Sequence, residues 1–134
     1  MTKKQINSPE FAQPLGSYSH GYTVDVGDSQ LIFTTGQIAL NAVGEVMHPN
    51  DVSKQTEFVF ESLQKILVAA GSSLDDVVKA TIYLTNIADF SLISPIRNKY
   101  FERSKPVSTL VAVTALVKPD CKVEIEVIAV KKKQ

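Results

Sequence analysis

The chain has 134 residues, 44% of them hydrophobic and 21% charged, a composition typical of a globular protein with one core. Basic and acidic side chains number 14 each and give a formal net charge of zero, so nucleic acid is not expected as a partner. No apolar run approaches the ~20 residues that span a bilayer, and the first residues lack the apolar core of a signal peptide. The lone Cys121 excludes an intrachain disulfide. We expect one domain over residues 1–134, located in the cytoplasm, without a membrane partner.

The first part of the chain predicts an irregular lead-in followed by a β-hairpin. Residues 1–16 are polar and contain two prolines, which favours irregular structure. Alternating apolar residues predict strands over residues 19–26 and 31–35, with turn-forming residues 27–30 between them. Gly36 ends the second strand. A glycine there lets backbone amides approach a ligand closely, and a β-bulge explains it equally well.

The clearest helical pattern begins after Asn50 and Asp51, either of which can cap a helix. Gly71 stands where such a helix would end. Between them, apolar residues and one threonine recur at spacings of three and four residues, the pattern of one buried stripe. They are Val52, Thr56, Val59, Leu63, Ile66, Leu67 and Ala70.

The second half of the chain predicts a strand over residues 78–84 and a helix from Asp89 to about residue 101. Pro95 falls inside that helix, where a proline costs ~3 kcal/mol unless the helix kinks or starts late. In a late start, Ser94 would cap the helix with Pro95 in its first turn. A further strand is expected over residues 108–114, joined by a tight turn at 118–120 to the last strand.

The last strand, residues 122–130, alternates with period two. One face carries only apolar side chains and is expected to pack on the helices. The other face begins with Glu124 and Glu126 and then becomes apolar. Such a face suits a subunit interface with a small polar site at its rim, and an open sheet face with solvated glutamates is the alternative.

The order of these elements predicts an α+β fold, with one mixed sheet and two helices packed on one of its faces. The apolar residues of the other face then predict self-association, because a large uncovered apolar surface marks an interface.

Several segments, taken in order, resemble the RidA/YjgF family of small trimeric proteins. They are residues 16–19 (GSYS), 33–38 (FTTGQI), 55–71, 74–79 (LDDVVK), 89–90, 100–101 and 123–126 (VEIE). The resemblance implies a chorismate-mutase-like protomer and a homotrimer packed sheet to sheet, with a small-molecule cleft at each subunit interface. It also implies hydrolysis of enamines and imines, such as 2-aminoacrylate, 2-iminopropanoate and 2-iminobutanoate, to 2-keto acids and ammonia, with no cofactor or metal.

The resemblance also assigns roles to particular residues. Glu124 would orient the attacking water and take its proton. Tyr18 would close over the ligand, while the Thr35 hydroxyl and the Gly36 amide would hold a carboxylate oxygen. Ser108 would supply another backbone donor.

The chain departs from the family pattern in ways that bear on the substrate. Val107 aligns with the arginine that holds the substrate carboxylate, and valine offers no donor. Ser94 aligns with an asparagine that lines the cleft, and Ser17 with a proline. A catalytically active divergent enzyme acting on a ligand without a carboxylate is one alternative, and a non-catalytic trimeric binding or regulatory protein is another.

Other candidate residues carry weaker signals. Arg103, Lys105 and Lys118 are possible replacement cations or simply solvated loop charges. His20 is expected at the surface or at the edge of the cleft, and it shows no metal-ligand spacing with His48. Ribonuclease activity would be supported by a histidine pair or a basic groove, and the sequence indicates neither.

Overall fold

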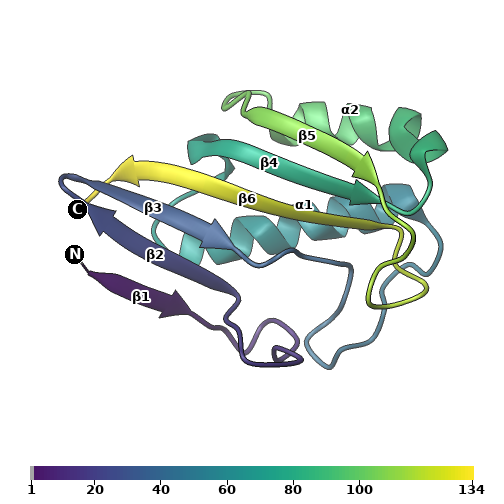
Figure 1. Ribbon diagram of the computed structural model, residues 1–134, viewed down its shortest axis with the longest axis horizontal. Helices are drawn as coiled ribbons and strands as arrows, with labels where there is room; N and C mark the ends of the chain where they lie inside the picture. The colour runs from purple at the N-terminus through teal and green to yellow at the C-terminus, as the bar shows by residue number, and fades with distance from the viewer. Residues whose placement is uncertain (1) are drawn as a thin grey trace.

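The computed structural model describes residues 2–134 as a six-stranded mixed sheet with two helices on one face (Figure 1). The strands are β1 (Lys3–Ile6), β2 (Gly21–Val26), β3 (Ser29–Thr34), β4 (Val77–Leu84), β5 (Val107–Ala112) and β6 (Val123–Lys132). The helices are α1 (Val52–Ala69) and α2 (Phe90–Tyr100), with short 3-10 turns η1 (Leu74–Asp76) and η2 (Ile87–Asp89). The predicted α+β class, with both helices on one face, is confirmed.

The α1 helix forms where the apolar spacing predicted it. The Asp51 side chain caps it by accepting from the amide of Lys54 at 3.1 Å. Gly71 follows the helix with a φ of +76°, a left-handed conformation that suits glycine. The apolar stripe is buried against the sheet, and Val59, Leu63 and Ile66 are fully inaccessible to solvent.

The last strand, β6, lies in the middle of the sheet, whose order is β1-β2-β3-β6-β4-β5. The predicted turn at 118–120 forms, with the amide of Cys121 donating to the carbonyl oxygen of Lys118 at 3.0 Å. It does not join two neighbouring strands, however, so the expected pairing of the last two strands is wrong. The β5 strand pairs in parallel with β4, as expected when a helix forms the crossover, and the chain then crosses to insert β6 antiparallel between β3 and β4. Val123, Ile125 and Val127 point to the helices and are buried, as their alternation predicted.

The lead-in is not irregular throughout, because β1 forms an edge strand against β2. Its sequence, KKQI, has little strand preference, and only Ile6 is buried. Pairing with β2 supplies hydrogen bonds that local sequence does not indicate, from Lys3 opposite Val24 to Ile6 opposite Gly21.

A bulge in β4 changes which side chains face the core. Pairing with β6 shifts between Val77 and Lys79, so Val77 is buried and Val78 is 46% exposed. Regular alternation over the predicted strand, residues 78–84, puts Val78 on the same face as Ala80. This expectation is wrong, because the bulge reverses the alternation.

Helix α2 runs without a break through Pro95, so a late start at Ser94 is also wrong. Asn86 begins the segment by accepting from the amide of Ala88 at 3.0 Å, and the 3-10 turn η2 leads directly into α2. The Asp89 side chain makes no capping hydrogen bond.

The sheet face opposite the helices carries an apolar area formed by neighbouring strands. Phe33 on β3 is 37% exposed and stands beside Ile128 of β6, and Val130 of β6 is likewise 37% exposed beside Leu31. Neither helix has the length and apolar character needed to cross a bilayer within residues 2–134.

Candidate functional site

A cavity of about 360 Å³ lies where β3 and the start of β6 meet the loop at residues 11–18. It brings together Tyr18, Thr35, Gly36 and Glu124, which lie far apart in the sequence. Its other lining residues are Phe11, Ala12, Gln13, Pro14, Leu15, Gly16, His20, Gln37, Ile38, Leu40 and Val117. Most of these side chains are apolar and form the wall of the cavity. Thr35, Gly36 and Glu124 form its polar floor.

An interruption of the β3–β6 ladder exposes the floor of this cavity. Phe33 pairs with Ile128 and Gln37 with Ile125, so three residues, 34–36, oppose two, 126–127. The Thr34 hydroxyl lies 3.1 Å from the amide of Val127 and takes the place of a backbone acceptor. The chain between Thr34 and Gln37 is therefore unpaired. This is the β-bulge that was one of the two explanations for a glycine at position 36.

Gly36 touches the carboxylate of Glu124. A Cβ added at Gly36 would lie 3.0 Å from Cδ and 3.1 Å from Cγ of Glu124, and closer still to Oε2. The Gly36 amide makes no hydrogen bond to any of the described residues 2–134. The site therefore pairs a free N–H donor with an adjacent carboxylate.

Glu124 is half-buried, and its carboxylate accepts no hydrogen bond from residues 2–134. Burial, and then repulsion by Glu126, raise its pKa above the usual glutamate value. Glu126 is itself held by the Tyr83 hydroxyl, which donates to Oε1 at 2.7 Å. A carboxylate in this state is a stronger base than a solvated one, as general base catalysis requires.

Thr35 is committed to structure rather than free to donate. Its hydroxyl donates to the carbonyl oxygen of Ser19 and its amide donates to the carbonyl oxygen of His20 at 2.9 Å. The hydroxyl oxygen can still accept a hydrogen bond, but its proton is already used. This limits the donor role that the family resemblance implied.

Tyr18 stands at the mouth of the cavity and is 48% exposed. Its hydroxyl accepts from the amide of Leu15 at 2.9 Å, and its amide donates to the carbonyl oxygen of Gly16. The ring is thus fixed to its own loop rather than to the sheet, in a place where it can cover a bound molecule.

His20 is buried, 5% exposed, and the expectation of a surface histidine was wrong. Its Nδ1 accepts from the amide of Ser8 at 3.1 Å, and Nε2 lies 2.9 Å from the carbonyl oxygen of Ala12. Phe11 packs edge-on against the ring. Both nitrogens are used to fasten the loop, so His20 borders the cavity without a nitrogen free for chemistry. Its sequence neighbours gave no sign of this role.

The remaining predicted site residues lie elsewhere in the protomer. Val107 is on β5 in the same row as Lys79 and Ile128, four residues along the sheet from the row of Glu124. Strand spacings place it roughly 16 Å from Glu124. Ser108 lines a separate groove beside Lys105, and Ser94 on α2 accepts from the Arg97 guanidinium at 3.1 Å. Within one chain, these residues do not contribute to the Glu124 cavity.

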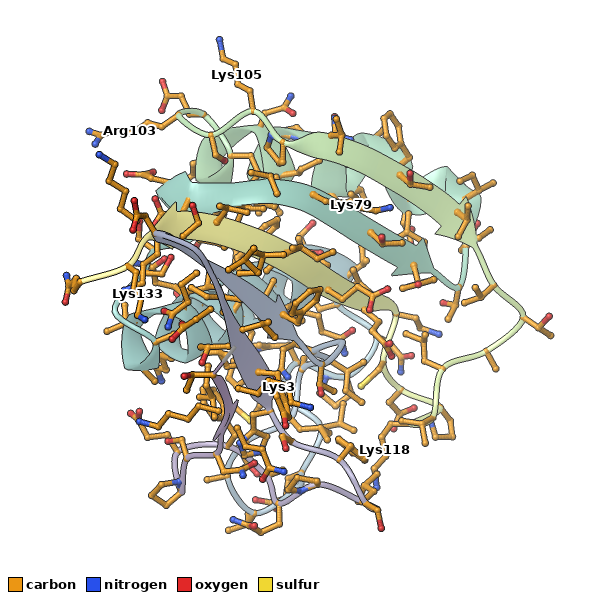
Figure 2. All side chains as sticks on the ribbon, turned by 60° about the vertical axis from the view of Figure 1, so that its left-hand side comes forward. Lys3, Lys79, Arg103, Lys105, Lys118 and Lys133 are labelled. Carbon is orange, nitrogen blue, oxygen red and sulfur yellow. The ribbon has the colours of Figure 1, made fainter. Side chains whose placement is uncertain are left out.

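The candidate replacement cations also lie outside the cavity. Arg103 contacts Asp75 at 3.6 Å, and Lys105 lines the groove at Ser108. Figure 2 shows both extending outward at one edge of the molecule. Lys118 follows the lining residue Val117 but does not itself line the cavity. No group of three His, Cys, Asp or Glu side chains able to hold a metal occurs in the part of the chain described, residues 2–134.

Comparison with known proteins gives the family of the chain. A family model described as Endoribonuclease L-PSP matches residues 8–131. A RutC family protein of Pyrococcus abyssi is 39% identical over 132 residues, covering 98% of this chain and 99% of the relative. The 2-iminobutanoate/2-iminopropanoate deaminase of Dermatophagoides farinae is 31% identical over 128 residues, covering 96% of each chain.

The solved structures agree with the sequence matches. The crystal structure of the yeast protein YEO7 has a TM-score of 0.87 and 31% identity to this chain, covering 99% of this chain and 100% of that one. Sequence matches and fold similarity both extend over nearly the whole chain. The protein is a member of the RidA/YjgF family.

Proposed function

We propose that the protein hydrolyses the C=N bond of a small imine, or of the enamine from which the imine forms, in the Glu124 cavity. The observation that carries this proposal is the half-buried Glu124 carboxylate, unpaired within residues 2–134, beside the free Gly36 amide. A relative named 2-iminobutanoate/2-iminopropanoate deaminase supports the reaction class, and 2-iminopropanoate and 2-iminobutanoate are the reference substrates.

The chemistry needs little more than a positioned base. Glu124 accepts a proton from water as the water oxygen bonds to the imine carbon, and the C=N electron pair moves to nitrogen. Nitrogen receives that proton from Glu124, which gives a neutral carbinolamine. Glu124 then takes the hydroxyl proton of the carbinolamine and passes it to nitrogen, so that the C–N bond breaks and ammonia leaves as the carbonyl forms. The Gly36 amide belongs to the residue that contacts the carboxylate and makes no hydrogen bond within residues 2–134, so it is available to donate to an oxygen of the intermediate.

The assembly proposed is a homotrimer whose subunits pack through the open sheet face, with a cleft where two subunits meet. The apolar surface at Phe33, Ile128 and Val130 supports it, since a face of this kind is a typical interface. A separation of roughly 16 Å between Val107 and Glu124 means that the two could share a cleft only across subunits. A cytoplasmic location belongs to the same proposal.

The experiment is a timed release of carbonyl product from imines generated in place by an oxidase. The wild-type protein should accelerate hydrolysis of at least one imine, and Glu124→Gln should remove the acceleration while leaving the circular dichroism spectrum unchanged. Equal rates with and without wild-type protein, on both carboxylate-bearing and carboxylate-free imines, would refute the proposal.

A second candidate is a trimeric binding protein without turnover. It is favoured by the residues near β5, because positions 106–117 contain no Lys or Arg that could anchor a substrate carboxylate. A small molecule that raises the melting temperature and is recovered unchanged would support it. Cleavage of nucleic acid is not proposed, since the cavity offers one carboxylate and a histidine whose two nitrogens are both bonded.

A further inference from the structure

A groove of about 460 Å³ lies where the end of α2 meets the start of β5. Its lining residues are Arg97, Asn98, Phe101, Glu102, Lys105, Pro106 and Ser108. The β5 strand forms one edge of the sheet and pairs only with β4 (Figure 1). The unpaired backbone groups of an edge strand form a surface that another chain can cover. The groove therefore lies where the proposed trimer can bring a neighbouring subunit against it.

Arg97 in this groove has no carboxylate partner within its own subunit. The chain contains two arginines. Arg103 pairs with Asp75 at 3.6 Å, whereas Arg97 forms no ion pair within residues 2–134. Glu102 also lines the groove, and it forms no ion pair with Arg97 either. A half-buried guanidinium without a counter-charge is available to bind an anion.

Neutral groups of α2 hold the Arg97 side chain in place. Its Nη2 donates to Ser94 Oγ at 3.1 Å, and Nε and Nη2 each donate to Asn98 Oδ1 at 3.2 Å. The ring of Phe90 lies against the guanidinium, with its centroid 5.5 Å from Cζ. Nη1 donates to no residue within 2–134, so its two N–H groups are free. A guanidinium held in this way loses less conformational entropy when it binds an anion.

We propose that Arg97 of one subunit holds the substrate carboxylate in the cleft that contains Glu124 of the next subunit. This inference rests on the proposed C=N hydrolysis and the proposed trimer, and it specifies the substrate class as 2-imino acids. Within one chain the groove is separate from the Glu124 cavity, because Val107, next to Ser108, is roughly 16 Å from Glu124. One subunit would thus bind the carboxylate while the other activates the water.

Two predicted site residues meet at Arg97, which supports this assignment. Ser94 accepts a hydrogen bond from Arg97, and Ser108 lines the same groove. Val107 offers no donor to a carboxylate, and positions 106–117 contain no Lys or Arg. Arg97 supplies from α2 the planar, two-pronged donor that the β5 segment lacks.

Lys105 is the other cation of the groove. It is exposed, and Figure 2 shows its side chain extending outward. An ammonium on a flexible stem binds a carboxylate as a point charge, without the two parallel hydrogen bonds that a guanidinium makes. The structure therefore favours Arg97 over Lys105 as the residue that holds the substrate.

A matched pair of imines tests the role of Arg97. 2-Iminopropanoate and propan-2-imine differ only in a carboxylate replaced by a methyl group, and oxidases form them from alanine and isopropylamine. In Arg97→Ala we expect kcat/KM for 2-iminopropanoate to fall by about 10- to 100-fold, as for lost charge-assisted hydrogen bonds. Hydrolysis of propan-2-imine should change by less than about twofold, because it has no carboxylate to bind. The control is Arg103→Ala, which removes the arginine paired with Asp75 and should leave both rates unchanged.

Mixed trimers test whether two subunits share the cleft. Arg97→Ala and Glu124→Gln chains, co-expressed with different affinity tags and purified over both, give trimers that contain each variant. In every such trimer one of the three clefts would combine an intact Arg97 with an intact Glu124, so we expect about a third of wild-type activity on 2-iminopropanoate. Each variant alone should stay well below that level.

The outcomes separate this inference from the proposed function. No acceleration of either imine by the wild-type protein would overturn both. Wild-type activity with equal losses on the two imines in Arg97→Ala would leave C=N hydrolysis standing and overturn the carboxylate role. A larger selective loss in Lys105→Ala would assign the carboxylate to Lys105 instead, and wild-type acceleration of propan-2-imine alone would overturn the substrate class. Mixed trimers no more active than the single variants would show that Arg97 and Glu124 do not meet in one cleft.

Discussion

Gly36 and Glu124 are in van der Waals contact, with no room between them for a Cβ. We therefore predict that Gly36→Ala displaces the Glu124 carboxylate, since an added Cβ would lie 3.0 Å from Cδ. A shift of about 1 Å in a catalytic group lowers turnover by on the order of 100-fold. Overpacking should cost ~1–3 kcal/mol of stability as well. Imine hydrolysis and urea unfolding measure the two effects.

Gly16→Ala is the control for stability in that experiment. A Cβ at Gly16 would meet only the ring of Tyr18, at 3.8 Å, which is ordinary contact. Its unfolding midpoint should stay within error of the wild type. Full activity in Gly36→Ala would show that the position of the Glu124 carboxylate does not matter for turnover.

The ionisation of Glu124 should be visible in the pH dependence of the rate. Its pKa is raised by burial and then by Glu126, so the acid limb of the pH–rate profile should lie above the usual glutamate range. Replacing Glu126 by Gln removes the repulsion that opposes ionisation, so the acid limb should move to lower pH. Glu102→Gln, on an exposed residue outside the cavity, is the control and should leave the profile in place. An unmoved limb in Glu126→Gln would contradict the assigned coupling.

A buried glutamine holds two loops against the first turns of α1. Gln55 is fully buried, and its Nε2 lies 2.9 Å from the carbonyl oxygen of Asp120 and 3.1 Å from that of His48. Its Oε1 accepts from the amide of Lys122 at 2.8 Å. Gln55→Leu leaves the Lys122 amide without an acceptor, whereas the carbonyl oxygens of Asp120 and His48 keep the amides of Asn50 and Asp51. We expect a loss of at least ~2 kcal/mol, from ~1–3 kcal/mol for the unsatisfied amide and ~0.5–1.5 kcal/mol for each of the two other hydrogen bonds.

Gln64→Leu is the matched control for the glutamine experiment. Gln64 accepts a single hydrogen bond, from the amide of Leu74 at 2.9 Å, and is only half-buried. Gln64→Leu should lower the free energy of unfolding by about 1 kcal/mol. Equal losses in the two variants would mean that the Gln55 network adds nothing beyond one bond.

The open sheet face predicts a change in association state. Phe33→Lys places a charge beside Ile128, in the middle of the apolar area. Because an unpaired charge in an interface is strongly unfavourable, the variant should have a lower mass than the wild type in light scattering at equal concentration. Val43→Lys, on an exposed loop, should keep the wild-type mass. A wild-type protein that is already monomeric would refute the proposed trimer.

Local pattern was sufficient for elements whose own residues decide their structure. The stripe from Val52 to Leu67 defines α1, and the alternation of β6 correctly separates buried valines from Glu124 and Glu126. The family resemblance predicts that Tyr18, Gly36 and Glu124 share one site. The structure places all three around one cavity, and their roles there stay predictions.

Features that depend on distant partners could not be predicted in this way. The β1 strand exists because β2 offers it an edge, and Val78 faces outward because pairing with β6 slips at that point. His20 is buried because Ser8 and Ala12 fold back over it. None of these partners is visible from the local sequence of the residue concerned, and the separation of Val107 from Glu124 depends on pairing across three strands.

The central place of β6 constrains how the protein is made. The hairpin strands β1, β2 and β3 join β4 and β5 into one sheet only through residues 123–132 (Figure 1). A ribosome delivers that segment after all the other strands. Until it emerges, β1–β3 and β4–β5 are two half-sheets whose inner edges are unpaired, and the Glu124 cavity cannot form. Nascent chains of this protein should therefore depend on holding chaperones until the C-terminal strand is released.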